Sequence, residues 1–242
     1  MKETRALPTW FSGTGRKISV LLIGAGGNGS EFFDGCVRIH SGLEALGAEG
    51  LDVTVLDDDE VSEANCVRQR YYPHEVGLKK AIALVQRSNL LMGTNWKAVP
   101  ERLEKPLQGG AKYDLIVTAV DNVAARALVA KSHAPQTLWL DLGCDKAQGQ
   151  VVLGQLGHNK LTDTLPTVLA HWPDMLKQED NNVPSCSAAD SIRRQDLMVN
   201  SAVAGAAINL LWQSLRKGVV PYNGVMIDLE DGFSQAIPFM PL

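Results

Sequence analysis

Short apolar runs alternate with longer stretches of helical periodicity over the first 145 residues. The apolar runs contain almost no polar side chains, which is typical of parallel strands that are buried on both faces. We expect strands at 18–23, 51–57, 96–99, 113–120 and 138–142, and helices at 28–46, 75–91 and 123–132. The expected helix at 75–91 has its apolar positions at Val76, Ala83, Leu84 and Leu90. This alternation predicts an α/β fold with a Rossmann-like, doubly wound, mainly parallel sheet.

The pattern changes after residue 145. A strand at 150–156 has no helix before it, and a loop with several prolines covers 159–184. A long helix at 195–215 and a hairpin of 224–229 with 234–239 complete the chain. We therefore expect one domain over 1–242, made of an arm (1–16), a nucleotide-binding core (17–145) and a C-terminal antiparallel extension with the long helix (146–242).

Composition narrows the class of protein. Apolar residues make up 45% of the chain, and the net charge of −4 argues against general nucleic-acid binding. The first residues lack the apolar region of a signal peptide, and the longest apolar run, 202–212, is too short to cross a bilayer. The four cysteines form no Cys-x-x-Cys pair, so we expect neither a disulfide framework nor a structural zinc, and a cytoplasmic location.

A glycine-rich loop directly follows the first core strand. Glycines there allow a tight turn and let backbone N–H groups approach a phosphate at the start of the next helix. The loop predicts a nucleotide site, and its absence of a Gly-Lys-Ser/Thr sequence excludes a P-loop. It does not distinguish NAD from ATP. Its residues are Gly24, Gly26, Gly27, Asn28 and Gly29.

An acidic residue at the end of the second strand suits a ribose. Asp57 holds that position, where a carboxylate accepts hydrogen bonds from ribose hydroxyls in such folds. It lies farther along the chain than usual, which we attribute to extra length at 41–50. Its neighbours Asp58 and Asp59 leave the register open by one residue, and Asp59 is included among the candidate nucleotide-binding residues.

An ordered set of polar residues follows, and it carries a family resemblance. The set comprises Asn65, Arg68 and Gln69, then Lys80 within Val-Gly-Leu-Lys-Lys-Ala, then Asp121 and Asn122 followed by Arg126. With the glycine loop, this set resembles the ThiF/MoeB superfamily, which includes the adenylation domains of ubiquitin-activating enzymes. It is especially similar to the ThiF-family proteins of PRTRC systems. The resemblance covers about 18–145 and, more weakly, 184–212.

The resemblance implies an ATP-dependent activating enzyme. Such an enzyme adenylates the C-terminal carboxylate of a small ubiquitin-like protein, works with Mg²⁺ and forms a homodimer. By this analogy Asn65, Arg68, Gln69 and Asn122 surround the nucleotide, Asp57 binds its ribose, Lys80 reaches the α- or β-phosphate, and Asp121 is a Mg²⁺ ligand. The chemistry is consistent, because Arg offers phosphate a bidentate fork, Lys a point charge, and carboxylate oxygen suits Mg²⁺. The partner protein would contact the C-terminal extension.

Two further roles are implied by position only. Cys186 lies roughly where relatives carry a thiol that accepts the activated carboxylate as a thioester. Relatives also complete the site with an arginine from the N-terminal arm of a second subunit, for which Arg5 and Arg16 are candidates.

Ordinary structural interpretations stand beside these roles. Arg68 and Lys80 could be surface cations, Asp121 and Asn122 could cap the next helix, and Cys186 could be a buried or loop cysteine. Three other functions also remain open. They are an adenylyltransferase for a sulfur carrier or a tRNA base, a nucleotide-binding scaffold without catalysis, and an NAD oxidoreductase, which would leave Arg68, Lys80 and Asp121 unexplained.

Overall fold

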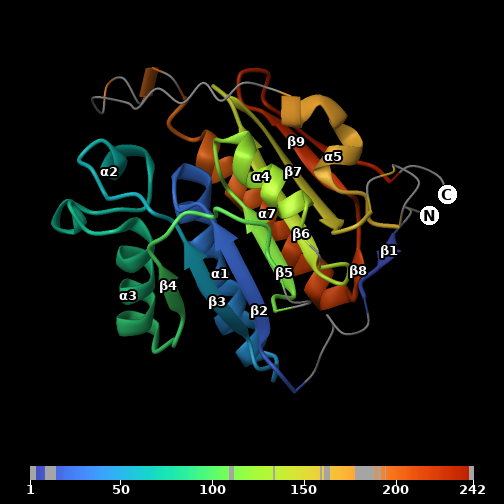
Figure 1. The fold of residues 1–242 in the computed structure, drawn as a ribbon, viewed down its shortest axis with the longest axis horizontal. Coiled ribbons are helices and arrows are strands. Elements are labelled where there is room, and N and C mark those ends of the chain that lie inside the picture. The colour runs from blue at the N-terminus through green and yellow to red at the C-terminus, as the bar shows by residue number, and fades with distance from the viewer. Residues whose placement is uncertain are drawn as a thin grey trace.

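The computed structural model describes residues 4–8, 15–108, 112–132, 134–158, 160, 164–177, 189, 192–193 and 195–239. Its centre is an eight-stranded sheet in the order β10-β9-β7-β6-β5-β2-β3-β4 (Figure 1). The strands β2 to β6 are parallel, and β7, β9 and β10 join them antiparallel. This confirms the predicted Rossmann-like sheet with an antiparallel extension. The bounds are β2 (Ile18–Ile23), β3 (Leu51–Leu56), β4 (Lys97–Val99), β5 (Leu115–Thr118), β6 (Leu138–Cys144), β7 (Gln148–Gln155), β9 (Gly224–Asp228) and β10 (Phe233–Ile237).

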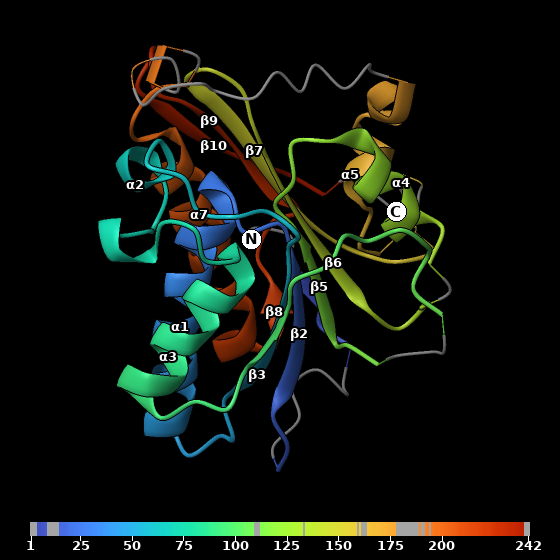
Figure 2. The same ribbon diagram turned by 60° about the vertical axis from the view of Figure 1, so that its left-hand side comes forward.

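Helices cover both faces of the sheet, as Figure 2 shows. One face carries the larger core with α1 (Gly27–Ala45), α3 (Lys80–Met92) and α7 (Val199–Lys217). The other carries a smaller core with α4 (Val123–Ala130), α5 (Val168–His171) and the 3₁₀ turn η2 (Pro173–Lys177). Helices α1 and α7 pack so closely that a Cβ on Gly35 would lie 2.2 Å from the side chain of Ile208. None of the helices in the described ranges is long and apolar enough to cross a membrane.

The helix expected at 75–91 begins later than predicted. A 3₁₀ turn, η1 (Pro73–Glu75), comes first, and Gly77 then adopts a φ of +89°, which ends any helical continuation. Helix α3 starts only at Lys80. Two of the four apolar positions named for this helix are exposed, Val76 to 41% and Leu90 to 83%. The two that are buried are Ala83 and Leu84.

The C-terminal extension follows the prediction in outline. The hairpin of β9 and β10 forms, and the long helix begins at Val199 instead of 195. The described part of the expected loop 159–184 includes α5 and η2. The chain's arm contributes a short strand: β1 (Arg5–Ala6) pairs with β8 (Val219–Val220) in a separate two-stranded sheet.

A buried carboxylate links two parallel strands, β2 and β5, at their N-terminal ends. Asp114, just before β5, accepts two hydrogen bonds from Arg16, of 2.5 Å from NH1 and 2.7 Å from NH2. It also accepts from the backbone N–H of Ser19 at 2.8 Å, at the start of β2. Burial alone would raise the pKa of the Asp114 carboxyl. The hydrogen bonds from Arg16 and Ser19 together outweigh burial and hold this pKa below its usual value.

The depressed pKa of Asp114 predicts a loss of stability in acid. Its contribution is present above the unfolded value of about 3.9 and is lost as pH falls through the lower folded pKa. We expect Asp114→Asn to lose on the order of 2 kcal/mol at neutral pH. We also expect its free energy of unfolding to fall less steeply in acid than that of the wild type. Urea unfolding at neutral and acid pH measures both.

A matched control is Asp52→Asn. Asp52 pairs with Lys97 at 3.6 Å, and the two side chains are 39% and 66% exposed, respectively, so this change should cost less than about 1 kcal/mol. Equal acid sensitivity of the wild type and Asp114→Asn would contradict the assignment.

Candidate functional site

The glycine loop turns tightly between β2 and α1. Gly24 has a φ of +91° and donates its N–H to the carbonyl of Leu56 at 3.0 Å. A Cβ at Gly24 would lie 2.7 Å from the carbonyl oxygen of Ala119, so the loop also closes on the end of β5. The carboxyl ends of β2, β3 and β5 therefore meet at this loop, since these strands are parallel.

The glycines of the loop serve different purposes. A Cβ on Gly29 would lie 1.9 Å from the carbonyl oxygen of Gly24, so the first turn of α1 can pack on the loop only without a side chain there. A Cβ on Gly26, by contrast, would meet no atom within 4 Å. Gly24 and Gly29 are thus required by the turn itself, whereas Gly26 borders open space at the N-terminus of α1.

Asp57 supports the loop from the end of β3. Its Oδ2 accepts a hydrogen bond of 2.6 Å from the backbone N–H of Ala25, and its Oδ1 accepts one of 3.0 Å from that of Asp59. Burial raises the pKa of the Asp57 carboxyl above its usual value, although these hydrogen bonds and nearby Lys80 oppose the rise. The predicted ribose ligand is therefore also a part of the loop's scaffold.

Lys80 is held beside this carboxylate. It is the first residue of α3, its side chain is only 8% exposed, and its Nζ lies 2.8 Å from Oδ2 of Asp59. Its backbone N–H donates to the carbonyl of Asp59 at 2.9 Å. The preceding Lys79 is 39% exposed and binds Glu60 at 3.2 Å. The structure thus separates the two lysines: Lys80 is buried at the site, and Lys79 faces solvent.

Arg68 lies at the end of a single helical turn, α2 (Asn65–Arg68), and reaches the start of α7. Its NH1 donates to Oε1 of Gln195 at 2.5 Å and to Oδ1 of Asn200 at 2.6 Å. Burial lowers the pKa of the Arg68 guanidinium. Asn65 accepts a hydrogen bond from the N–H of Ser62 at 2.9 Å. The surface-cation interpretation of Arg68 therefore does not describe this side chain.

Two residues fix the segment after α2 on the loop. The hydroxyl of Tyr71, a residue 3% exposed, donates to the carbonyl of Ala25 at 2.6 Å. The N–H of Arg70 donates to the hydroxyl of Ser30 at 3.0 Å. Gln69, between Arg68 and these anchors, has a buried Oε1 without a hydrogen-bond partner among the described residues. The polar set from 65 to 69 is thereby held next to the glycine loop.

Asp121 and Asn122 differ in their surroundings. Asn122 is the N-cap of α4, and its Oδ1 accepts from the N–H of Ala125 at 2.9 Å, which is the capping role that the sequence left open. Asp121 is exposed. It follows Val120, which lies against Gly24. Arg126 is buried and donates to Oδ1 of Asp141 at 2.8 Å, so it forms part of the structure under the site.

The sequence analysis missed the residues that α7 and β6 bring to the loop. Asn28, at the start of α1, donates to Sγ of Cys144 at 3.4 Å. Asn200 donates to Oδ1 of Asn28 at 2.8 Å and is 2% exposed. The available signal was an asparagine within the apolar positions of a predicted helix. Burial raises the pKa of the Cys144 thiol.

The remaining predicted participants are one cysteine and two arginines. Cys186 falls outside the described residues. Arg16 binds Asp114 at the opposite, N-terminal end of the parallel strands. Arg5 is in β1, where its guanidinium lies 5.0 Å from the ring centroid of Phe239. Neither arginine lies at the loop within its own chain.

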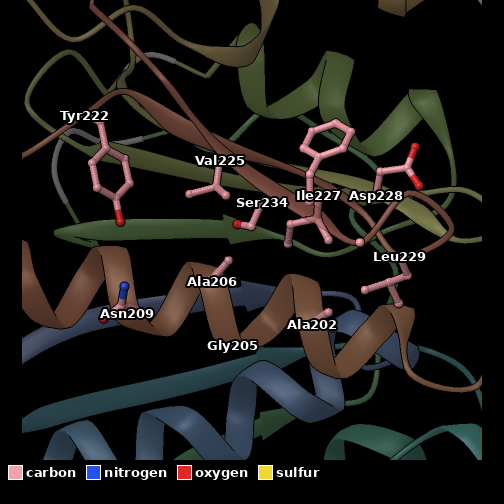
Figure 3. Close-up of a pocket in the computed structure, with 12 residues that line it drawn as sticks. Ala202, Gly205, Ala206, Asn209, Tyr222, Val225, Ile227, Asp228, Leu229 and Ser234 are labelled. Carbon is pink, nitrogen blue, oxygen red and sulfur yellow. The ribbon is translucent and has the colours of Figure 1, made fainter.

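One groove in the described part of the chain is separate from this site. It has a volume of about 460 Å³ and lies between α7 and the β9–β10 hairpin (Figure 3). Small residues of α7, such as Ala202 and Ala206, face Val225 and Ile227 across it. None of the predicted nucleotide-site residues lines this groove, so we place the candidate site at the glycine loop.

The steric roles of the glycines predict different stabilities for alanine variants. Gly24→Ala forces a side chain into a positive φ and against a carbonyl, so we expect a loss of more than about 2 kcal/mol. Gly26→Ala has space and a negative φ, so its loss should stay below about 1 kcal/mol. Chemical denaturation of the two variants compares them. Equal losses would show that the loop is not packed as described.

Comparison with known proteins places this geometry in a family. The ThiF family model matches residues 14–231. No curated protein matches the chain significantly. The fold is similar to that of PaaA, at 17% identity and a TM-score of 0.61, over 93% of this chain and 65% of PaaA. It is also similar to that of E. coli MccB crystallised with ATP, at 14% identity and a TM-score of 0.58, over 93% of this chain and 64% of MccB.

A second MccB structure, crystallised with AMPCPP and MccA, gives 13% identity and a TM-score of 0.58, again over 93% of this chain and 64% of MccB. This chain therefore spans less than two thirds of the length of PaaA or MccB. At these identities the similarity shows a shared fold. Because the family model matches nearly the whole chain, this protein belongs to the ThiF family.

Proposed function

We propose that this chain binds ATP at the glycine loop and adenylates a carboxylate, releasing pyrophosphate. The observation that carries the proposal is the pair of cations at the loop. Lys80 is buried and is held by Asp59, and the half-buried Arg68 is held by Gln195 and Asn200. A dinucleotide cofactor needs no such pair, whereas a triphosphate and a departing pyrophosphate do.

The geometry supports a division of roles. Gly26 leaves room for a phosphate at the N-terminus of α1, where backbone N–H groups favour negative charge. Asp57 would accept hydrogen bonds from the ribose hydroxyls in addition to the one that it accepts from the N–H of Ala25. Lys80 and Arg68 would stabilise the charge on the α-phosphate, as the incoming carboxylate attacks it, and on the leaving pyrophosphate. On the basis of the family resemblance, we assign nucleotide contacts to Asn65 and Gln69. We include Asp59 because of its place in the acidic run at the end of β3.

Mg²⁺ fits this site as a companion of ATP. The described residues contain no group of three or more His, Cys, Asp or Glu side chains that could hold a metal ion. Mg²⁺ commonly binds through one or two carboxylates together with phosphates, so one exposed carboxylate suffices when ATP supplies the rest. Asp121 provides it, one residue beyond the Val120 that contacts the loop. The ion would neutralise phosphate charge.

The partner and the later steps extend the proposal. We propose that the acceptor is the C-terminal carboxylate of a small ubiquitin-like protein, that Cys186 can take the acyl group as a thioester, and that the enzyme is a cytoplasmic homodimer of a PRTRC system. Family resemblance supports these points, and MccB was crystallised with MccA as well as with AMPCPP. We propose that residues 1–242 form one adenylation domain.

Lys80→Met tests the proposed nucleotide site. The change removes the charge and retains most of the side-chain volume. The remaining Asp59 is 60% exposed, so folding should change little. We expect ATP affinity, measured by calorimetry with Mg²⁺, to fall at least about tenfold. Lys79→Met is the matched control and should bind ATP like the wild type. Binding of NAD instead of ATP, or indifference to Lys80, would contradict the proposal.

Asp121→Asn tests the metal ligand. Because Asp121 is exposed, the variant should fold with unchanged stability. We expect Mg²⁺ to strengthen ATP binding in the wild type, and this increment to disappear in the variant. Asn122→Ala should instead cost about 1 kcal/mol through the lost cap, with the Mg²⁺ increment intact. A full Mg²⁺ increment in Asp121→Asn would remove this residue from the site.

A further inference from the structure

A single buried amide joins the C-terminal helix to the glycine loop. Asn200 is the second residue of α7 and is 2% exposed. Its Nδ2 donates to Oδ1 of Asn28 at 2.8 Å and to Sγ of Cys144 at 3.3 Å. Its Oδ1 accepts from NH1 of Arg68 at 2.6 Å. The amide thus contacts the first turn of α1, the end of β6 and the guanidinium of α2 at once.

Gln195 repeats part of this arrangement just before α7. Its Oε1 accepts from the same NH1 of Arg68 at 2.5 Å, and its Nε2 donates to Sγ of Cys144 at 3.3 Å. Two acceptors on one nitrogen of a planar guanidinium define the orientation of that plane. Gln195 and Asn200 therefore fix how the Arg68 charge is presented at the loop.

Asn200 also determines how closely α7 approaches the loop. A Cβ on Gly27 would lie 2.4 Å from Oδ1, 2.5 Å from Cγ and 2.7 Å from Nδ2 of Asn200, and these are its three nearest atoms. Gly27 is the first residue of α1, in a conformation with negative φ that alanine tolerates. The side chain of Asn200 is therefore the obstacle to a methyl group there.

We propose that Asn200, assisted by Gln195, is a positioning residue that holds Arg68 and the N-terminus of α1 in the arrangement that receives the phosphates. The inference rests on the proposed function, since it names the residues that orient the phosphate-binding arginine. Asn200 acts through Arg68 and does not itself contact the reacting atoms. An apolar residue of similar volume would fill the same space, but it would remove one of the two acceptors that orient the Arg68 guanidinium.

The test is a double-mutant cycle read by calorimetric binding of ATP with Mg²⁺. The proteins are the wild type, Asn200→Leu, Arg68→Ala and the double variant. We expect each single variant to bind ATP about tenfold more weakly, and the double variant to bind no more weakly than Arg68→Ala. A buried asparagine with only a structural role would weaken binding equally in both backgrounds. Additive losses, or wild-type affinity in Asn200→Leu, would overturn the inference.

Gly27→Ala provides a second variant that retains Asn200. The added methyl should turn the Asn200 side chain away from Arg68, so we expect about a tenfold loss of ATP affinity with a native circular dichroism spectrum. In an Asn200→Ala background the obstacle is gone, and Gly27→Ala should add no further loss. A further loss there would show that position 27 acts independently of Asn200, against the inference.

The outcome for the wild type separates the two proposals. If the wild type fails to bind ATP, the proposed function fails, and the positioning role fails with it. If the wild type binds ATP and Lys80→Met weakens this binding while Asn200→Leu does not, the function stands and only the positioning role is overturned.

Discussion

The close approach of two backbone segments at the glycine loop is the constraint on which this site depends. The carbonyl of Gly24 occupies the space that a side chain at position 29 would need, and Ala119 closes the same turn from the neighbouring strand. Because of these close contacts, the C-terminal ends of three strands and the first turn of α1 form one rigid unit. Asp57 then reaches the N–H of Ala25, and the polar residues of the site have fixed places to attach.

Attachment proceeds outward from this unit through short polar contacts. Tyr71 ties the segment after α2 to the loop, and Asp59 ties Lys80 to the neighbourhood of Asp57. Each cation therefore has an acceptor before any ligand is present. Such preorganisation lowers the reorganisation needed when charge develops during a reaction. The cost is the burial of charged groups, which these acceptors offset.

Much of the core and of the loop could be predicted from the sequence, because periodicity and glycine spacing are local signals. The buried runs of β2, β3 and β5 and the glycine loop are of this kind. The start of α3 was misjudged, because the conformation of Gly77 overrides the apolar pattern around Val76. The order of Asn65, Arg68 and Lys80 along the chain indicated a site, and the family resemblance selected Lys80 of the lysine pair, which the structure shows to be the buried one.

The remaining features depend on contacts between distant segments and have no local signal. Asn200 is 132 residues from Arg68 and 172 from Asn28, so only the packing of α7 on α1 reveals their association. An asparagine at position 122 suits a helix cap as well as a nucleotide contact, so the sequence alone could not show that Asn122 caps α4. Lys79 is the N-cap of α3 and Lys80 is its first residue, so only the fold shows which of these two adjacent lysines is buried against Asp59.

The ion pair of Arg16 and Asp114 has a practical consequence for studies of this protein. It links β2 and β5 at the strand ends opposite the glycine loop, away from Lys80, Arg68 and Asp57. This stabilising ion pair and the candidate site therefore lie at opposite ends of the same parallel strands. Substitutions that stabilise the strand ends near Arg16 would give a more stable protein. Destabilising substitutions at the glycine loop could then be studied in a chain that still folds.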